Sequence, residues 1–125
     1  MIALILALAG LLMVSVYRPL GLDPRWAASA PSIWHLLVVG WLTQLIFGVA
    51  FWLFPRRNAA HPRGSITLAW GSWILLNLGL VLRLIAEPVA ILYHERTSLT
   101  VFSGVLQWLA ALLFVINTWP RIKER

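Results

Sequence analysis

The chain contains no cysteine and very little charge. Its 125 residues include only four Asp or Glu against ten Lys or Arg, and charged residues make up 11% of the total. The lack of cysteine excludes disulfides, thiolate catalysis, Cys-ligated zinc and iron–sulfur clusters. The sequence also lacks a phosphate-binding loop, a carboxylate pair and a Ser/His/Asp set, so nothing in it supports hydrolase chemistry.

Apolar residues dominate what is present. They make up 61% of the chain, and the mean hydropathy is +0.85. A soluble domain of this length buries too little surface to hide so much apolar area, whereas a lipid bilayer solvates apolar outer faces. We therefore expect one integral membrane domain, residues 1–125. The net charge of +6 does not indicate nucleic-acid binding, because the basic residues lie between apolar stretches.

Four apolar stretches are expected to cross the membrane as helices: residues 2–17, 33–54, 66–86 and 99–119. The first gives roughly 24 Å of helix, slightly less than the ~30 Å hydrocarbon core, and the others are long enough to cross it. Pro55, Pro88 and Pro120 are expected to end the last three. Short loops make consecutive helices neighbours, so the predicted fold is an all-α four-helix membrane bundle with up-down-up-down topology.

The first stretch can also be interpreted as a secretory signal peptide. It lacks a basic segment before it, and the nearest small-x-small motif, Ala28-Ser29-Ala30, lies far beyond it and after Pro24. We therefore expect residues 2–17 to be retained as a helix.

The distribution of basic residues predicts the orientation. The segment between the second and third stretches and the C-terminal tail together carry Arg56, Arg57, Arg63, Arg121, Lys123 and Arg125. In the other two loops, basic and acidic residues balance. The positive-inside rule therefore predicts N-in/C-in orientation, with both termini in the cytoplasm. We expect a multi-pass protein of a bacterial inner (plasma) membrane.

Polar groups at membrane depth are informative, because they are costly there and usually face protein, water or a ligand. His35 is the third residue of the second stretch, and Arg83 lies four residues before Glu87, where the third is expected to end. These two helices run in opposite directions, so each side chain lies ~5–6 Å along its helix from the outer end. A histidine and an arginine at one level of the membrane can hold one haem, because an imidazole binds the iron and a guanidinium binds the propionates. Alternatively, Arg83 extends to lipid headgroups and His35 simply lies at the interface.

The other two histidines lie in expected loops. His61 is on the cytoplasmic side, separated from His35 by a helix of roughly 28 Å, so one iron cannot bind both within one chain. His94 is in the outer loop, from which it can fold back to the level of His35. His94 is therefore a candidate for cofactor binding.

The remaining polar and small residues indicate helix packing. Gly40, Gln44 and Gly48 repeat every four residues, and at about 100° per residue Gln44 is expected ~180° around the helix from His35. This places two non-lipid faces on the second helix. The later helices carry a set that lets helices approach closely: Asn77, Gly79, Ser103, Gln107, Ala110, Ala111 and Thr118. No expected spanning stretch contains an acidic residue, which argues against a proton-coupled transporter.

The run from His35 to Pro55 has a recognisable pattern. It reads HLLVVGWLTQLIFGVAFWLFP, with histidine at the outer end, then Gly-Trp, then Ile-x-Gly, then a closing proline. It resembles helix II of the haem-copper oxidase large subunit, the superfamily of cytochrome c oxidases and nitric oxide reductases. Residues 77–83 are more loosely similar to helix III. The resemblance implies that His35 is an axial ligand of a low-spin haem, here expected to be haem b.

The resemblance covers only the first four helices of that family. The family's second low-spin ligand, its copper ligands and its high-spin haem ligand lie on later helices, and its core needs six histidines where this chain has three. A complete oxidase is therefore not expected, and whether the chain is an enzyme is left open. The missing axial ligand can come from His35 of a second copy about a two-fold axis, from His94, or from another protein.

Three functions remain open. The first is a b-type haem protein for electron transfer or diatomic-gas binding, as a homodimer or attached to a larger respiratory complex. The second is a haem-free structural or assembly subunit of a respiratory or photosynthetic membrane complex, indicated by the short loops and polar stripes. The third is a small drug-type transporter acting as a dimer, which the chain length suits but the charge bias does not.

Overall fold

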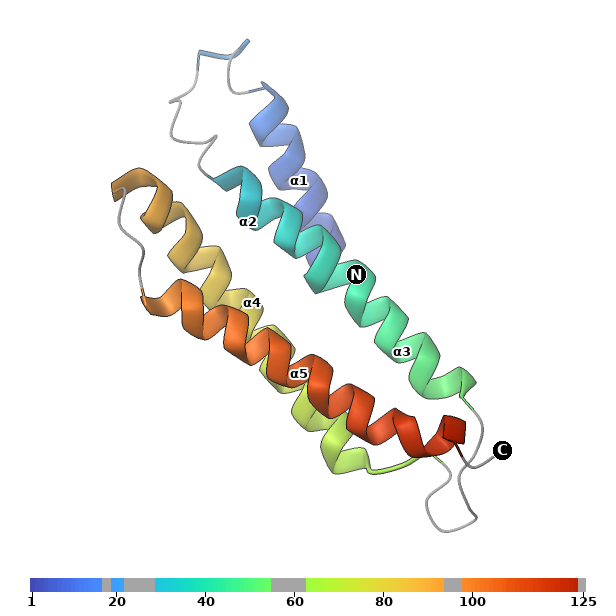
Figure 1. Cartoon of the computed structure of the whole chain (residues 1–125). Helices are drawn as coiled ribbons and strands as arrows, with labels where there is room; N and C mark the ends of the chain where they lie inside the picture. The colour runs from blue at the N-terminus through green and yellow to red at the C-terminus, as the bar shows by residue number, and fades with distance from the viewer. Residues whose placement is uncertain (17–18, 22–28, 55–62, 94–97, 124–125) are drawn as a thin grey trace.

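The computed structural model describes residues 1–16, 19–21, 29–54, 63–93 and 98–123, and every regular element in these ranges is a helix (Figure 1). The elements are α1 (Ile2–Val16), α2 (Ala30–His35), η2 (Leu36–Thr43), α3 (Gln44–Leu53), α4 (Ile66–Tyr93) and α5 (Ser98–Lys123). Because α2, η2 and α3 follow one another without a break, we call them together the 30–53 helix.

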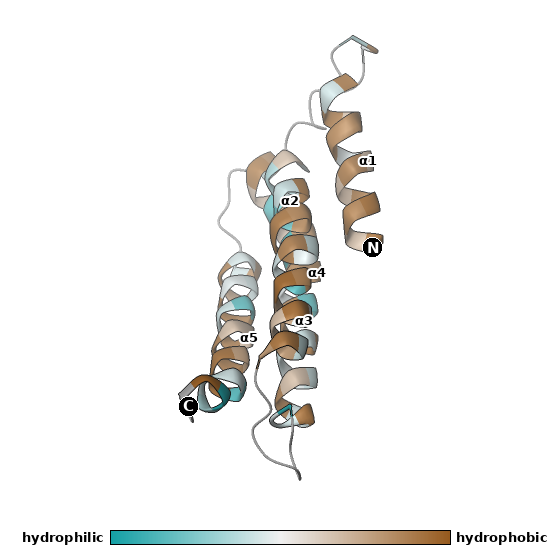
Figure 2. Cartoon of the chain, turned by 90° about the vertical axis from the view of Figure 1, so that its right-hand side faces the viewer, coloured by the Kyte–Doolittle hydropathy of each residue, from teal (hydrophilic) through white to brown (hydrophobic). Residues whose placement is uncertain are grey.

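Three of these helices are long and apolar enough to cross a membrane: the 30–53 helix, α4 and α5. These three spans contain 24, 28 and 25 residues. A helix needs roughly 20 residues to cross the bilayer core. Hydrophobic residues cover most of the helical surface (Figure 2). α1 is apolar but has only 15 residues, roughly 22 Å of helix. The prediction of an all-α fold is therefore confirmed for the described residues, and the three long apolar helices and one shorter one are compatible with a helical membrane protein.

Consecutive helices run antiparallel. α4 and α5 pack side by side along most of their length (Figure 1). The 30–53 helix contacts α4 mainly through α2 and η2. α1 lies against that same half, where Gly10 faces Ile33 and Ala3 faces Gly40. α1 therefore accompanies only the first half of the 30–53 helix.

Two prolines that were expected to end helices lie within them. α4 continues through Pro88 to Tyr93 rather than ending at Ala86, and α5 continues through Pro120 to Lys123. Helices in membranes tolerate proline because neighbouring groups satisfy the freed backbone carbonyls. Pro55 lies outside the described residues, and α3 ends at Leu53. The extension of α4 places Glu87 inside a helix of membrane-spanning length, not in the outer loop.

The segment that follows His35 is π-helical. η2 comprises eight residues, and the Thr43 hydroxyl donates a hydrogen bond to the carbonyl of Val38, five residues earlier, at 2.9 Å. The backbone hydrogen bonds of a π-helix span five residues instead of four, so a π-helix turns by roughly 80° per residue instead of about 100°. Over eight residues the difference accumulates to roughly 160°.

This rotation decides which neighbour the polar residues meet. Gln44 Nε2 donates to Asn77 Oδ1 on α4 at 3.0 Å, and His35 also reaches α4, at Glu87. The prediction that Gln44 and His35 lie on opposite faces is therefore wrong. It assumed α-helical periodicity throughout, and the π-helical segment turns both side chains toward one partner.

Candidate functional site

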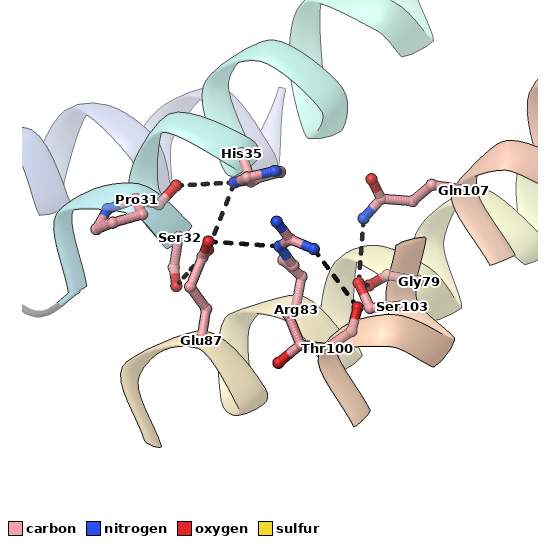
Figure 3. Close-up of polar contacts among 9 residues, drawn as sticks. All are labelled: Pro31, Ser32, His35, Gly79, Arg83, Glu87, Thr100, Ser103 and Gln107. Atoms are coloured by element: carbon pink, nitrogen blue, oxygen red, sulfur yellow. Dashed lines mark hydrogen bonds and ion pairs between the residues drawn. The ribbon is translucent and has the colours of Figure 1, made fainter. Parts of the chain in front are cut away.

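His35, Arg83 and Glu87 converge between α2 and α4 (Figure 3). The Nδ1 atom of His35 lies 3.4 Å from Glu87 Oε2, and Arg83 Nε lies 3.5 Å from Glu87 Oε1. The side chains of His35, Arg83 and Glu87 are 29%, 22% and 14% exposed. His35 and Arg83 both contact the same carboxylate, so they lie at one level of the α2–α4 pair, as their spacing along the two helices predicts.

The spacing of these residues explains why they meet. Arg83 and Glu87 are four residues apart on α4, so they share one helix face. Ser32 and His35 are three residues apart on α2 and share a face in the same way. The Ser32 hydroxyl, which is buried, donates to Glu87 Oε2 at 3.2 Å. The carboxylate of Glu87 thus links one face of α2 to one face of α4.

A backbone contact orients the His35 ring. Nδ1 lies 3.0 Å from the carbonyl oxygen of Pro31, one turn earlier in the same helix. A carbonyl oxygen only accepts hydrogen bonds, so Nδ1 carries the proton in this contact. The other ring nitrogen, Nε2, has no hydrogen-bond partner in the described part of the chain. A histidine with Nδ1–H bound to a carbonyl and Nε2 free is prepared for metal ligation.

Arg83 connects the cluster to α5. Its Nη1 atom donates to the carbonyl of Thr100 at 3.5 Å. Its Nε atom is buried and makes no hydrogen bond within the residues that the structure describes. A guanidinium has five N–H donors, so the chain uses only part of the capacity of Arg83.

The α4–α5 contact beside the cluster is made by residues that the sequence assigned to packing. The Ser103 hydroxyl donates to the Gly79 carbonyl at 2.8 Å, and Gln107 Nε2 donates to Ser103 Oγ at 3.4 Å (Figure 3). The interpretation of Gly79, Ser103 and Gln107 as packing residues is confirmed.

Two candidate residues fall outside the structure's description. His94 lies in the segment 94–97 and His61 in the segment 55–62. Within the described ranges, no group of three or more His, Cys, Asp or Glu side chains is arranged to hold a metal ion. The described residues therefore provide one histidine ligand and not a complete protein metal site.

Glu87 is the site residue that the sequence reasoning missed. Because Pro88 is expected to end the third helix, the sequence predicts Glu87 in the outer loop that follows. The Arg83-x-x-x-Glu87 spacing was the available signal, since opposite charges four residues apart pair on a helix. The expectation that no spanning helix contains an acid is wrong for the same reason. The lack of an intramembrane acid therefore no longer counts against a transporter, and the charge bias remains.

No protein-family model matches the chain, and neither does any curated protein or solved structure. A function is therefore assigned from the chemistry of His35, Arg83 and Glu87.

Proposed function

We propose that this chain is a membrane protein that binds haem b, with His35 Nε2 as an axial ligand of the iron. The observation that carries the proposal is the hydrogen bond between His35 Nδ1 and the Pro31 carbonyl, at 3.0 Å. In the neutral ring, this bond selects the tautomer in which Nε2 holds a lone pair. Such an orientation of the ring by a second contact is a regular feature of ligating histidines.

Arg83 is the proposed contact to a haem propionate. Its buried Nε faces Glu87 Oε1 at 3.5 Å and its Nη1 donates to the Thr100 carbonyl, so part of the five-donor capacity of the guanidinium stays available for a carboxylate. Guanidinium groups bind carboxylates through charge-assisted, often paired hydrogen bonds. Once bound, haem supplies a redox-active iron whose second axial position determines electron transfer or gas binding. The chain itself supplies the ligand, its orientation and the charges around it.

The pattern from His35 to Pro55 supports a relationship to helix II of the haem-copper oxidase large subunit. The antiparallel succession of the helices is compatible with the four-helix, N-in/C-in arrangement that the charge distribution predicts. We include both in the proposal, together with location in a bacterial inner membrane. The chain lacks the remaining oxidase ligands, so it is proposed to act in electron transfer or diatomic-gas binding, not as a complete oxidase.

A second axial ligand completes the proposal. A homodimer with a two-fold axis brings His35 of each copy to one iron. His94, or a residue of a larger respiratory complex, provides the other two possibilities. The ratio of haem to chain distinguishes them, because a shared iron gives one haem per two chains and a ligand within the chain gives one per chain.

Absorption spectra of the purified protein test the proposal. In mild detergent, oxidised and dithionite-reduced spectra with a pyridine haemochrome assay should show a Soret band and sharp reduced α and β bands. His35→Ala should abolish these bands, whereas His61→Ala should retain them as the matched control. A haem spectrum that survives in His35→Ala, or a preparation that stays colourless when haem precursor is supplied during expression, refutes the proposal.

The second candidate is a haem-free structural or assembly subunit. One observation favours it: Glu87 contacts both His35 and Arg83, so both side chains have a partner within the chain when no ligand is bound. In that case the protein should be colourless and should co-purify with larger membrane subunits. The haem assay above separates the two candidates directly.

A further inference from the structure

Glu87 is the least exposed of the three charged or titratable side chains His35, Arg83 and Glu87. The proposed haem contacts do not use it. Its two carboxylate oxygens contact His35 and Arg83, the two side chains that make the proposed haem contacts. Oε2 lies 3.4 Å from His35 Nδ1 and accepts a hydrogen bond from Ser32 at 3.2 Å, while Oε1 lies 3.5 Å from Arg83 Nε. One carboxylate therefore holds both the proposed iron ligand and the proposed propionate contact.

We propose that Glu87 is a positioning residue that orients His35 and Arg83 and, through its negative charge, lowers the reduction potential of the haem iron. This inference rests on the proposed function. A carboxylate next to the outer nitrogen of a ligating imidazole makes the ligand more electron-rich and favours the oxidised metal. The protein interior screens charges less than water does, so a charge at this distance acts strongly.

The charge of Glu87 is partly offset and not cancelled. Arg83 contacts Oε1 only at 3.5 Å, and its Nε makes no hydrogen bond among the described residues. α1, which packs on α2 and η2, carries no charged side chain. Of the four acidic residues of the chain, only Glu87 lies in the part that the structure describes. Among the described residues, Glu87 is therefore the one carboxylate to which the effect is assigned.

The test is the midpoint potential of the haem protein in which Glu87→Gln replaces the charge by an amide of the same shape. The amide oxygen still accepts the hydrogen bond from the Ser32 hydroxyl. We expect haem to be retained with unchanged stoichiometry. At a fixed potential, the ratio of reduced to oxidised protein should rise about tenfold, which is ~59 mV for a one-electron couple.

Glu124→Gln is the matched control. It removes the same charge at the position that follows Lys123, the last residue of α5, in the sequence, and should leave the potential unchanged. Glu87→Gln protein that holds haem with the potential of the control overturns the inference and leaves the His35 proposal intact. A wild-type protein without haem overturns both.

A second variant covers the case in which Glu87→Gln holds no haem. Glu87→Asp keeps the charge on a shorter side chain, and it should retain haem with a potential close to that of the wild type. Loss of haem in both variants shows a purely structural role and refutes the effect on the potential. Retention in Glu87→Asp alone supports a requirement for the charge.

Discussion

Arg121 is charged and yet almost completely buried, at 2% exposure. Its Nη1 and Nη2 atoms donate to the carbonyls of Phe51 and Phe54 at 3.0 and 2.6 Å. The guanidinium also lies 5.7 and 5.8 Å from the centroids of the two rings. These carbonyls are at the C-terminal end of α3, where a helix has unpaired acceptors and a partial negative charge. Arg121 therefore joins the end of α3 to α5.

Removal of this guanidinium should destabilise the fold. Arg121→Ala loses two hydrogen bonds from a charged donor, and we expect the free energy of unfolding in detergent to fall by about 2 kcal/mol or more. Arg121→Lys keeps the charge but not the planar fork, so its loss should be smaller. Thermal unfolding followed by circular dichroism measures both. Equal unfolding midpoints for wild type and Arg121→Ala would show that the contact contributes nothing.

The candidate site shows what sequence predicts at the residue scale. His35 and Arg83 were found because a polar residue in an apolar stretch is conspicuous and antiparallel helices bring equal depths together. Glu87 was missed because Pro88 was expected to stop the helix. Proline ends helices mainly in soluble proteins. A helix in a membrane continues through proline because neighbouring groups satisfy the freed backbone carbonyls.

At the scale of elements, the α4–α5 contact depends on small residues. The Ser72 hydroxyl donates to the Ala110 carbonyl and the Ser103 hydroxyl to the Gly79 carbonyl, each at 2.8 Å. A Cβ atom added to Gly79 would lie 2.9 Å from Gln107 Cγ and 3.0 Å from the Ser103 carbonyl oxygen. The two helices therefore approach too closely at Gly79 for any side chain.

Two alanine substitutions test this approach. Gly79→Ala should lower the stability of the helix pair by roughly 1–3 kcal/mol, because backbone atoms must move to make room. Gly104→Ala is the control, since nothing lies within 4 Å of a Cβ there, and it should gain up to about 1 kcal/mol from helix propensity. Denaturation in mixed detergent measures both. A Gly79→Ala variant as stable as Gly104→Ala contradicts the close contact.

η2 is the second feature at this scale. Nothing in the residues from Leu36 to Thr43 departs from an ordinary apolar helix pattern, and the sequence predicted regular α-helix there. The wider turn is a property of the backbone hydrogen bonds, which side-chain periodicity does not report. π-helical turns occur frequently at functional sites, and this one begins directly after His35.

At the scale of the whole molecule, the orientation in the membrane is open to a direct test. The chain has no cysteine, so a single introduced thiol reports one position without background. In intact bacterial cells permeable only at the outer membrane, Leu20→Cys should react with a membrane-impermeant maleimide. Ser65→Cys should react only after the inner membrane is opened. Both positions are exposed in the structure. The reverse labelling pattern contradicts the predicted N-in/C-in orientation.

The sequence alone determined that the chain is helical and has helices long and apolar enough to cross a membrane, and it placed these helices to within a few residues at most ends. Hydropathy and helix length are local and additive, so they need no knowledge of neighbours. The charge distribution and the histidine at the start of the second stretch are equally local. They were sufficient to propose an orientation and a haem ligand.

Only the tertiary structure decided how these elements meet. The π-helical turn brings Gln44 and His35 onto one neighbour, and the continuation of α4 through Pro88 places Glu87 between His35 and Arg83. α1 reaches only half of the helix that it accompanies. The physical reason is common to all three. Hydropathy and side-chain periodicity along one segment record neither the choice between α-helical and π-helical backbone bonds nor the contacts with groups far apart in the sequence.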